Sequence, residues 1–380
     1  MTMDTEQITV VQSAGTPAPR VSVLMAAHNG NAFIGYTLHS ILAQRFSDFE
    51  VVIVDDASID GTADVVRGFD DKRIRLISTP RNMGPPGARN VGYAACRGEY
   101  IAPVDQDDLW LPLRLARQVA YLDRHDEAAL VATATDRLVD GKRLASPEPV
   151  RTSPGFLRWA LMTGNPLVWS SVMIRRASLH AAGGPFNRED RRFAEDFDLY
   201  HRLQRVGTIG RIDEVLTTYR SHAAGASRVF GDKMMASAIR VLEDAYEPIL
   251  GANASRAAQA MARHVGGGEP VPDMKTLQLV QAVLQAMTQY VKASHSVDEV
   301  ARVLVATERE ALLRRVVRAA LRGGGVSVRA LRSAEMLHLA DLGTGALMRN
   351  SVLGLLRGTA PQHAAATRPA PAMRVVAAGR

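Results

Sequence analysis

The sequence predicts an α/β fold, with a mostly parallel sheet flanked by helices and an all-α region after it. Three apolar runs, at residues 21–27, 50–55 and 100–104, are short enough for buried strands and end in polar or acidic residues. Residues with helical spacing lie between these runs. Such alternation is typical of a parallel sheet covered on both faces.

The remaining elements follow from apolar spacing and turn residues. The first half adds a helix after residue 33, a helix from about Thr62, a strand at 74–77 and a helix around 87–95. The second half is expected to contain a helix at 112–121, a strand at 128–135, a loop at 140–155, a strand at 169–174, a helix at 195–203 and a strand at 215–219. From about Gly231 the pattern is wholly helical, with a clear apolar stripe over 277–291.

Charge divides the chain near the same place. Residues 1–230 hold 27 basic and 27 acidic residues, whereas residues 231–380 hold 19 basic and 12 acidic ones. We therefore predict a flexible lead-in at 1–20, an α/β domain at 21–230, a helical region at 231–360 and a disordered tail at 361–380. Loops are expected within the 140–170 and 183–193 segments.

Several classes of protein are disfavoured by composition. The single cysteine, Cys96, cannot form an internal disulfide, and the first residues lack the basic and apolar stretches of a secretory signal. No run of 18 apolar residues predicts a membrane-spanning helix. The basic tail lacks aromatic residues suited to stacking on bases, so no nucleic-acid partner is expected. The prediction is a cytoplasmic protein, peripheral at most to the inner face of a membrane.

The strongest local signal for chemistry is the acidic segment 105–108. Asp105, Asp107 and Asp108 follow a buried strand, where their charges repel one another. A divalent cation such as Mg²⁺ or Mn²⁺ would compensate that charge, because hard cations prefer carboxylate and phosphate oxygens. The alternative is that Asp107 or Asp108 caps the helix that starts near Pro112.

Other polar clusters follow the same logic. Asp55 and Asp56 end a second strand, where carboxylates can accept hydrogen bonds from a base or ribose. Glu195 and Asp196 begin a helix, a position that the helix dipole alone would favour. A Rossmann dehydrogenase is disfavoured because no Gly-x-Gly-x-x-Gly turn follows the first strand. Carboxylates at a strand end together with a metal would also serve a metal-dependent sugar nucleotidyltransferase, so that class stays open. A non-catalytic nucleotide-sugar binding module is the other alternative.

Taken together, these segments resemble family 2 glycosyltransferases, which are inverting enzymes with the GT-A fold. The resemblance runs from about residue 20 to 228. It rests on Val21–Asn29, Val54–Thr62, Gly84–Gly92, Asp105–Trp110, Glu195-Asp196 and Arg220–His222, which occur in the family's order. One departure is His28, where many members carry Tyr or Phe.

The resemblance implies a role for each matched residue. Asp196 resembles the general base, with Glu195 as the fallback, and Asp107 with His222 resembles the contacts to a divalent metal, Mn²⁺ or Mg²⁺. Trp110 and Glu195 would line the sugar or acceptor cleft. The implied nucleotide-binding residues of the donor site are Ala27, Asn29, Asp56, Arg89 and Asp105. The implied partners are a nucleotide-diphosphate sugar and a carbohydrate or lipid-linked acceptor, as in cell-surface polysaccharide or glycolipid synthesis.

The C-terminal region carries a separate hypothesis. Arg314, Arg318 and Arg322 are four residues apart, so they form one stripe on a helix, with Arg315 beside it. A basic helix of this kind can lie on an anionic membrane surface. The favoured alternative is a solvated face of a helical bundle that packs on the catalytic domain, or an interface in an oligomer.

Overall fold

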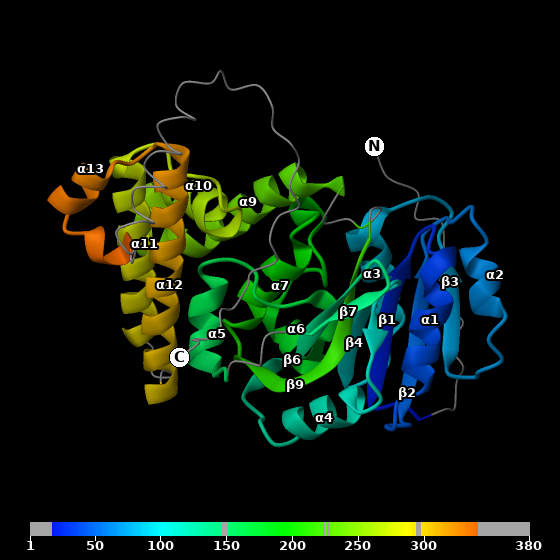
Figure 1. Ribbon diagram of the computed structural model, residues 1–380. Coiled ribbons are helices and arrows are strands. Elements are labelled where there is room, and N and C mark those ends of the chain that lie inside the picture. Colours follow the sequence, from blue (N-terminus) through cyan, green and yellow to red (C-terminus); the bar gives the residue numbers. More distant parts are fainter. Residues whose placement is uncertain (1–16, 146–150, 223–224, 226–228, 294–297, 341–380) are drawn as a thin grey trace, which may run out of the picture.

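A mixed sheet forms the centre of the molecule in the computed structural model, which describes residues 17–145, 151–222, 225, 229–293 and 298–340 (Figure 1). Among these residues the strand order is β3-β2-β1-β4-β8-β6-β9-β5, and β7 pairs with β6. The strands are β1 Val21–Ala27, β2 Phe49–Asp55, β3 Ile74–Ser78, β4 Tyr100–Asp105, β5 Leu109–Trp110, β6 Ala128–Val139, β7 Lys142–Leu144, β8 Val172–Arg175 and β9 Thr208–Ser221.

Most strands of the sheet run in one direction, whereas β5, β7 and β8 run in the opposite one. β3, β2, β1 and β4 are parallel neighbours, β8 is antiparallel to β4 and β6, and β6 and β9 are parallel to each other. The register places Ala27 opposite Asp55 and Ala26 opposite Asp105. The carboxyl ends of these strands therefore meet at one edge, where ligands bind to open α/β sheets.

Helices cover the sheet on both sides, as predicted. They are α1 Asn31–Leu42, α2 Thr62–Arg67, α3 Gly84–Ala95, α4 Arg114–Leu122, α5 Pro154–Leu161, α6 Arg176–Ala182 and α7 Glu195–Leu203. One apolar core lies between the sheet and helices α1, α2 and α4, and it includes Ile34, Leu38 and Leu115. A second core includes Trp159 and Phe197 and continues into the helical region.

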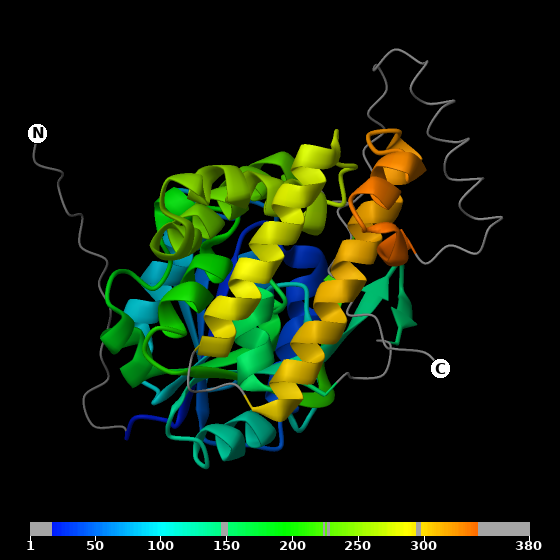
Figure 2. The same ribbon diagram turned by 90° about the vertical axis from the view of Figure 1, so that its left-hand side faces the viewer.

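The all-α region after the sheet is confirmed. Its helices are α9 Gly231–Leu250, α10 Ala254–Ala260, α11 Met274–Ala293, α12 Glu299–Gly323 and α13 Val328–Ser333. Figures 1 and 2 show α11 and α12 side by side, and both helices contact α5. The buried indole of Trp159 donates a hydrogen bond to the Thr288 hydroxyl over 3.1 Å. The sheet and the helices thus share one continuous apolar core.

Two local predictions were wrong. Segment 140–155 is not all loop, because β7 pairs with β6 and α5 begins at Pro154. The expected strand at 169–174 begins as a turn of 3-10 helix and becomes strand only at Val172. The predicted lead-in and tail lie almost wholly outside the described residues, and the domain boundaries stay predictions.

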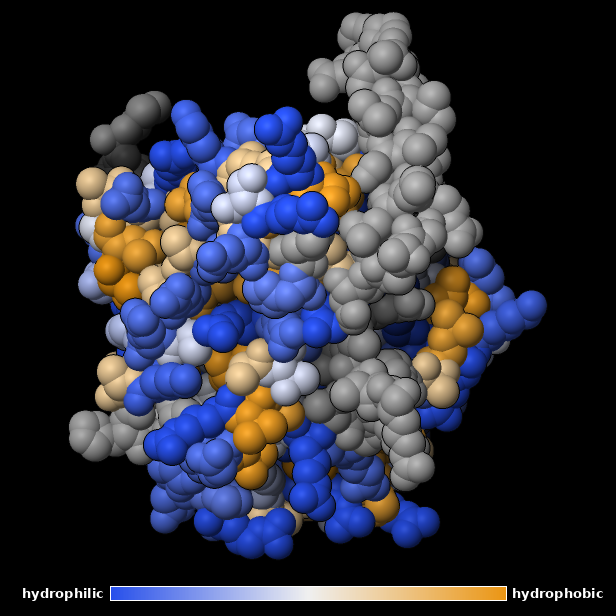
Figure 3. Space-filling view, turned by 60° about the vertical axis from the view of Figure 1, so that its left-hand side comes forward, coloured by the Kyte–Doolittle hydropathy of each residue, from blue (hydrophilic) through white to orange (hydrophobic). Residues whose placement is uncertain are grey.

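The basic stripe lies on α12, whose other face is buried. Apolar residues beside the stripe are in the core, namely Leu313, Val316, Val317 and Ala320. Arg314 pairs with Glu310 over 2.5 Å, and Arg315 lies 3.6 Å from Glu308. The face formed by the helical region is mostly hydrophilic in Figure 3, with hydrophobic residues in separate groups. Membrane contact and oligomer formation stay predictions; no described helix is long and apolar enough to span a bilayer.

Candidate functional site

The acidic segment after β4 is held to the end of β1 by a side-chain amide that sequence reasoning missed. Gln106 accepts a hydrogen bond from the His28 backbone N–H through Oε1 and donates to the His28 carbonyl through Nε2. Gly30 makes this possible, because a Cβ at that position would overlap the Gln106 amide. Gln106 therefore fixes the spacing between the two strand ends.

The expected base-binding residues also shape the surrounding loops. Asp56 is only 3% exposed, and its carboxylate accepts from the Thr79 hydroxyl and from the backbone N–H groups of Met83 and Gly84, over 2.8–3.0 Å. Only remaining lone pairs of Asp56 could receive a base N–H. Asn29, which has a positive φ of 49°, accepts from the Ile59 N–H and is exposed.

Ala27, a predicted donor-site residue, contacts Asp56 through its backbone. The Ala27 side chain is buried in the core below the site. Its carbonyl accepts a hydrogen bond from the Asp56 N–H over 2.7 Å. Ala27 therefore positions Asp56.

Arg89 joins two acidic residues that lie more than 80 positions apart in the chain. One guanidinium nitrogen donates to Asp105 and the other to Glu195, each over 2.8 Å. The Arg89 side chain is 11% exposed and lies over the Trp169 ring, 4.7 Å from its centroid. Burial opposes the charge of Arg89, but the carboxylates of Asp105 and Glu195 raise its pKa. This bridge brings the start of α7 to the end of β4.

Asp107 and His222 also meet, as the resemblance implied. His222 Nε2 lies 2.7 Å from Asp107 Oδ2, and both side chains are partly exposed. Burial and the charge of Asp105 raise the pKa of Asp107. The His222 ring packs on Phe33 at 4.7 Å between centroids, which fixes the imidazole near the carboxylate.

The neighbouring Asp108 has a structural contact instead. It is buried and accepts from the Arg220 backbone N–H over 2.8 Å, so it ties the acidic segment to β9. Burial and the charges of Asp107 and Asp105 raise the pKa of Asp108 well above its usual value. Asp108 does not cap the following helix, because α4 begins at Arg114 and receives no side-chain cap.

Asp196 lies in the first turn of α7. Its Oδ1 accepts from the Phe197 N–H over 2.8 Å, and its Oδ2 accepts from the Asn165 side-chain amide over 2.8 Å. Burial, followed by the charge of Glu195, raises the pKa of Asp196 to about 6. A carboxyl group with this pKa is suited to accept a proton near neutral pH. Asn165, on the loop after α5, carried no sequence signal.

The predicted place of Trp110 in the cleft was wrong. Its ring is 4% exposed and lies in the core, with the Arg114 guanidinium 3.6 Å from the ring centroid. Its indole N–H donates to the Ser170 carbonyl over 3.0 Å. The Ser170 hydroxyl in turn accepts from the Asp105 N–H over 2.9 Å. Trp110 thus supports the acidic segment from beneath.

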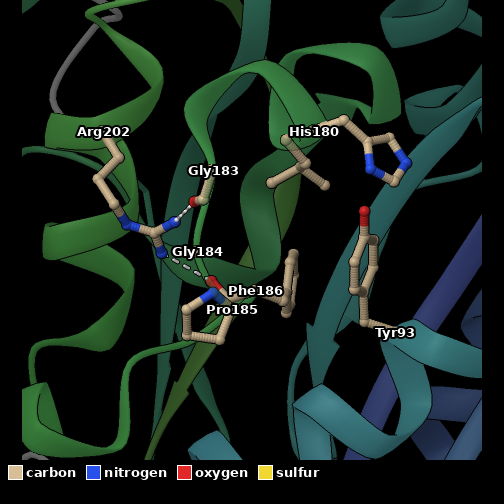
Figure 4. Close-up of a pocket in the computed structure, with 8 residues that line it drawn as sticks. Tyr93, His180, Gly183, Gly184, Pro185, Phe186 and Arg202 are labelled. Atoms are coloured by element: carbon tan, nitrogen blue, oxygen red, sulfur yellow. Dashed lines mark hydrogen bonds between the residues drawn. The ribbon is translucent and has the colours of Figure 1, made fainter.

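A pocket lies between α3 and the start of the 183–193 loop (Figure 4). Tyr93 and Phe186 stack there at 4.8 Å, and Arg202 donates to the carbonyls of Gly183 and Phe186. None of the predicted site residues lines this pocket. Figure 4 shows the Arg202 guanidinium directed at these two carbonyls, so Arg202 holds the start of the loop in place.

Comparison with known proteins identifies the family. The family model described as glycosyl transferase family 2 matches residues 22–180. The putative glycosyltransferase EpsE of Bacillus subtilis is 30% identical over 215 residues, which are 55% of this chain and 76% of that protein. The chain belongs to glycosyltransferase family 2. The predicted family is therefore confirmed, and glycosyl transfer is its chemistry.

Further relatives agree with this assignment. The Escherichia coli protein named UDP-Glc:alpha-D-GlcNAc-diphosphoundecaprenol beta-1,3-glucosyltransferase WfaP is 27% identical, over 54% of this chain and 79% of that protein. The succinoglycan biosynthesis protein ExoO of Rhizobium meliloti is 36% identical, over 50% of this chain and 53% of that protein. Membership of a glycosyltransferase family argues against the nucleotidyltransferase alternative.

The fold is also found in a solved structure. Residues 1–349 of Staphylococcus aureus TarS, in complex with UDP-GlcNAc, superpose with a TM-score of 0.54 at 20% identity. The match covers 79% of this chain and 90% of that chain. The predicted GT-A fold is thereby confirmed.

Proposed function

We propose that this family 2 glycosyltransferase is a metal-dependent inverting enzyme that uses a nucleoside-diphosphate sugar and an acceptor hydroxyl. The observation that carries the proposal is the network of Asp196, Glu195, Arg89 and Asp105. It joins a carboxyl group with a pKa of about 6 to the strand end that carries the acidic segment. Inverting transfer needs one such carboxylate opposite the leaving group.

The proposed reaction is a single displacement. The acceptor oxygen forms a bond to the anomeric carbon while the bond from that carbon to the diphosphate oxygen breaks. The acceptor proton passes to a carboxylate oxygen of Asp196, and the nucleoside diphosphate leaves with the bonding electron pair. Both Asp196 oxygens accept one hydrogen bond from the protein, which leaves each a lone pair for that proton.

The residues at the end of β4 and β9 fit a divalent cation. Asp107 and His222 are partly exposed and lie together, and the pKa of Asp107 is raised by burial and by the charge of Asp105. Among the described residues, no group of three or more His, Cys, Asp and Glu side chains could hold a metal ion. Mg²⁺ is commonly bound through one or two carboxylates together with substrate phosphates. Bound Mn²⁺ or Mg²⁺ would neutralise charge on the departing diphosphate.

The partners follow from chemistry and from the relatives. Asn29 and the loops that Asp56 fixes offer polar groups to a nucleotide. The E. coli relative carries the name of an enzyme that acts on a sugar linked to diphosphoundecaprenol. We therefore propose a saccharide acceptor, lipid-linked in cell-surface polysaccharide or glycolipid synthesis, which a cytoplasmic enzyme would meet at the inner membrane face.

The direct test measures products. The protein would be incubated with UDP-glucose or UDP-N-acetylglucosamine, with and without Mn²⁺ and Mg²⁺, and with an undecaprenyl-diphosphate-linked sugar. Release of nucleoside diphosphate, and a product whose anomeric configuration by NMR is opposite to that of the donor, would support the proposal. A product with retained configuration would refute the inverting mechanism, and full activity in EDTA would refute the metal.

A further inference from the structure

The loop between α5 and β8 places one amide against the proposed base. Asn165 Nδ2 lies 2.8 Å from Asp196 Oδ2, although the two residues are 31 positions apart. The other end of the amide is also engaged, because Asn165 Oδ1 accepts from the Leu167 backbone N–H over 3.1 Å. Only an oxygen can accept that N–H, so the NH₂ group must face the carboxylate.

The loop itself is anchored to the helix that carries Asp196. His201, which lies on the same helix α7, approaches the Leu161 carbonyl at the end of α5 to 3.2 Å through Nε2. Burial lowers the pKa of His201 to about 4, so this contact is made by the neutral ring at physiological pH. The contact between His201 and Leu161, which holds α5 and α7 together, therefore does not change in charge over the pH range in which Asp196 titrates.

Two charged groups near Asp196 have opposing effects on its pKa. Glu195 is adjacent on α7 and its negative charge disfavours the carboxylate, whereas Arg89 of α3 favours it. The buried phenol of Tyr200 lies on the same helix, and the charge of Asp196 acts on it. Among the described residues, Asn165 is the side chain that donates a hydrogen bond directly to the Asp196 carboxylate.

We propose that Asn165 is a positioning residue for the reaction: its amide fixes the Asp196 carboxylate in orientation and keeps it ionised for proton transfer. This inference rests on the proposed role of Asp196 as the base. It predicts that changes at Asn165 act on the chemical step and its pH dependence, and leave donor binding largely intact.

The decisive variant is Asn165→Asp. The new carboxylate can still accept the Leu167 N–H, so the turn is retained, but it places a negative charge where Asp196 had a donor. A like charge at this distance should raise the acidic limb of the kcat profile by about one pH unit or more. At pH 6, a limb moved from about 6 to about 7 lowers the ionised fraction, and with it kcat, about fivefold. Asn165→Ala, which removes both the donor to Asp196 and the acceptor of the Leu167 N–H but adds no charge, should give a smaller upward shift.

The assay measures release of nucleoside diphosphate from UDP-glucose or UDP-N-acetylglucosamine between pH 5 and 9, with kcat and the donor KM determined for each variant. Asn253→Asp is the matched control, because it makes the same substitution at an exposed helix start in the helical region. The control should keep the profile of the unmodified enzyme. Thermal unfolding would show that the Asn165 variants are folded.

The possible outcomes separate the two proposals. An unchanged acidic limb in folded Asn165→Asp and Asn165→Ala, together with an inactive Asp196→Asn, would overturn the positioning role and leave Asp196 as the base. Full activity of Asp196→Asn would overturn the base and this inference together. A loss in Asn165→Ala that appears only in donor KM would also refute positioning of the base.

Discussion

Removing Arg89 should leave two acidic side chains without their shared partner. Arg89→Gln replaces the guanidinium by a shorter, uncharged amide, so the charge that pairs with Asp105 and Glu195 is lost. The Glu195 side chain is 8% exposed and that of Arg89 is 11% exposed, so water screens this pair weakly. Breaking a buried pair by removing one partner typically costs about 3–5 kcal/mol. We expect a loss of about 3 kcal/mol, since Asp105 is the more exposed of the two acids.

The loss should depend on pH. Unpaired buried carboxylates acquire raised pKa values, and such groups destabilise the fold as pH rises through those values. The difference between the variant and the unmodified protein should therefore be larger at pH 8 than at pH 5. Urea unfolding monitored by tryptophan fluorescence measures it, because Trp169 lies against Arg89.

A matched exposed pair provides the control for this prediction. Arg117 and Glu214 are joined over 3.2 Å, but their side chains are 56% and 43% exposed. Arg117→Gln should cost no more than about 1 kcal/mol at either pH. If Arg89→Gln costs no more than Arg117→Gln, the bridge contributes little to stability and the reasoning from burial is refuted.

Three further predictions follow from the site and from α12. Asp196→Asn should fold and bind donor but lose on the order of 10²–10⁴-fold in kcat. In the unmodified enzyme, kcat should fall as pH drops below about 6, because Asp196 becomes protonated there. A flat kcat profile from pH 5 to 8 would contradict this. Asp107→Ala should cost about 3 kcal/mol or more in transition-state stabilisation. EDTA should inactivate the unmodified enzyme until Mn²⁺ or Mg²⁺ is restored. Near-normal rates in the variant would show that Asp107 does not bind the metal. Changing Arg314, Arg315, Arg318 and Arg322 to Gln should weaken salt-sensitive co-sedimentation with anionic vesicles, and no pelleting of the unmodified protein at low salt would leave α12 a packing element.

Sequence patterns predicted the elements whose packing follows from local composition. The runs that became β1, β2 and β4 are buried on both faces, and such strands have almost no polar positions. The missed helix α5 shows where this reasoning fails. Ser153 and Pro154 look like loop residues, but the Ser153 hydroxyl accepts from the Phe156 N–H and Pro154 occupies the first turn. Both residue types are favoured at helix starts as well as in turns.

The candidate site shows a similar division. Acidic residues at strand and helix ends could be found, because charge next to an apolar run is unusual. Gln106 and Asn165 could not be found, because each works through a partner 31 or more positions away. Gln106 lies inside the acidic segment 105–108, but there the carboxylates, and not the amide between them, carried the chemical signal. Trp110 was misplaced because a large aromatic beside an acidic motif suggests a cleft wall. Its surroundings, Arg114 and the Ser170 carbonyl, depend on tertiary packing.

The helical region is connected to the site through the loop that carries Asn165. The buried Tyr246 hydroxyl of α9 donates to the Met162 carbonyl, three residues before Asn165. Elsewhere on α9, Ser237 donates to the Arg192 carbonyl over 2.7 Å, and Asp244 pairs with Arg191 over 2.7 Å. These contacts connect α9 to the end of α5 and to the segment that precedes α7. Because packed interiors transmit strain, we expect changes in these α9 contacts to alter the geometry of the proposed base as well as the core.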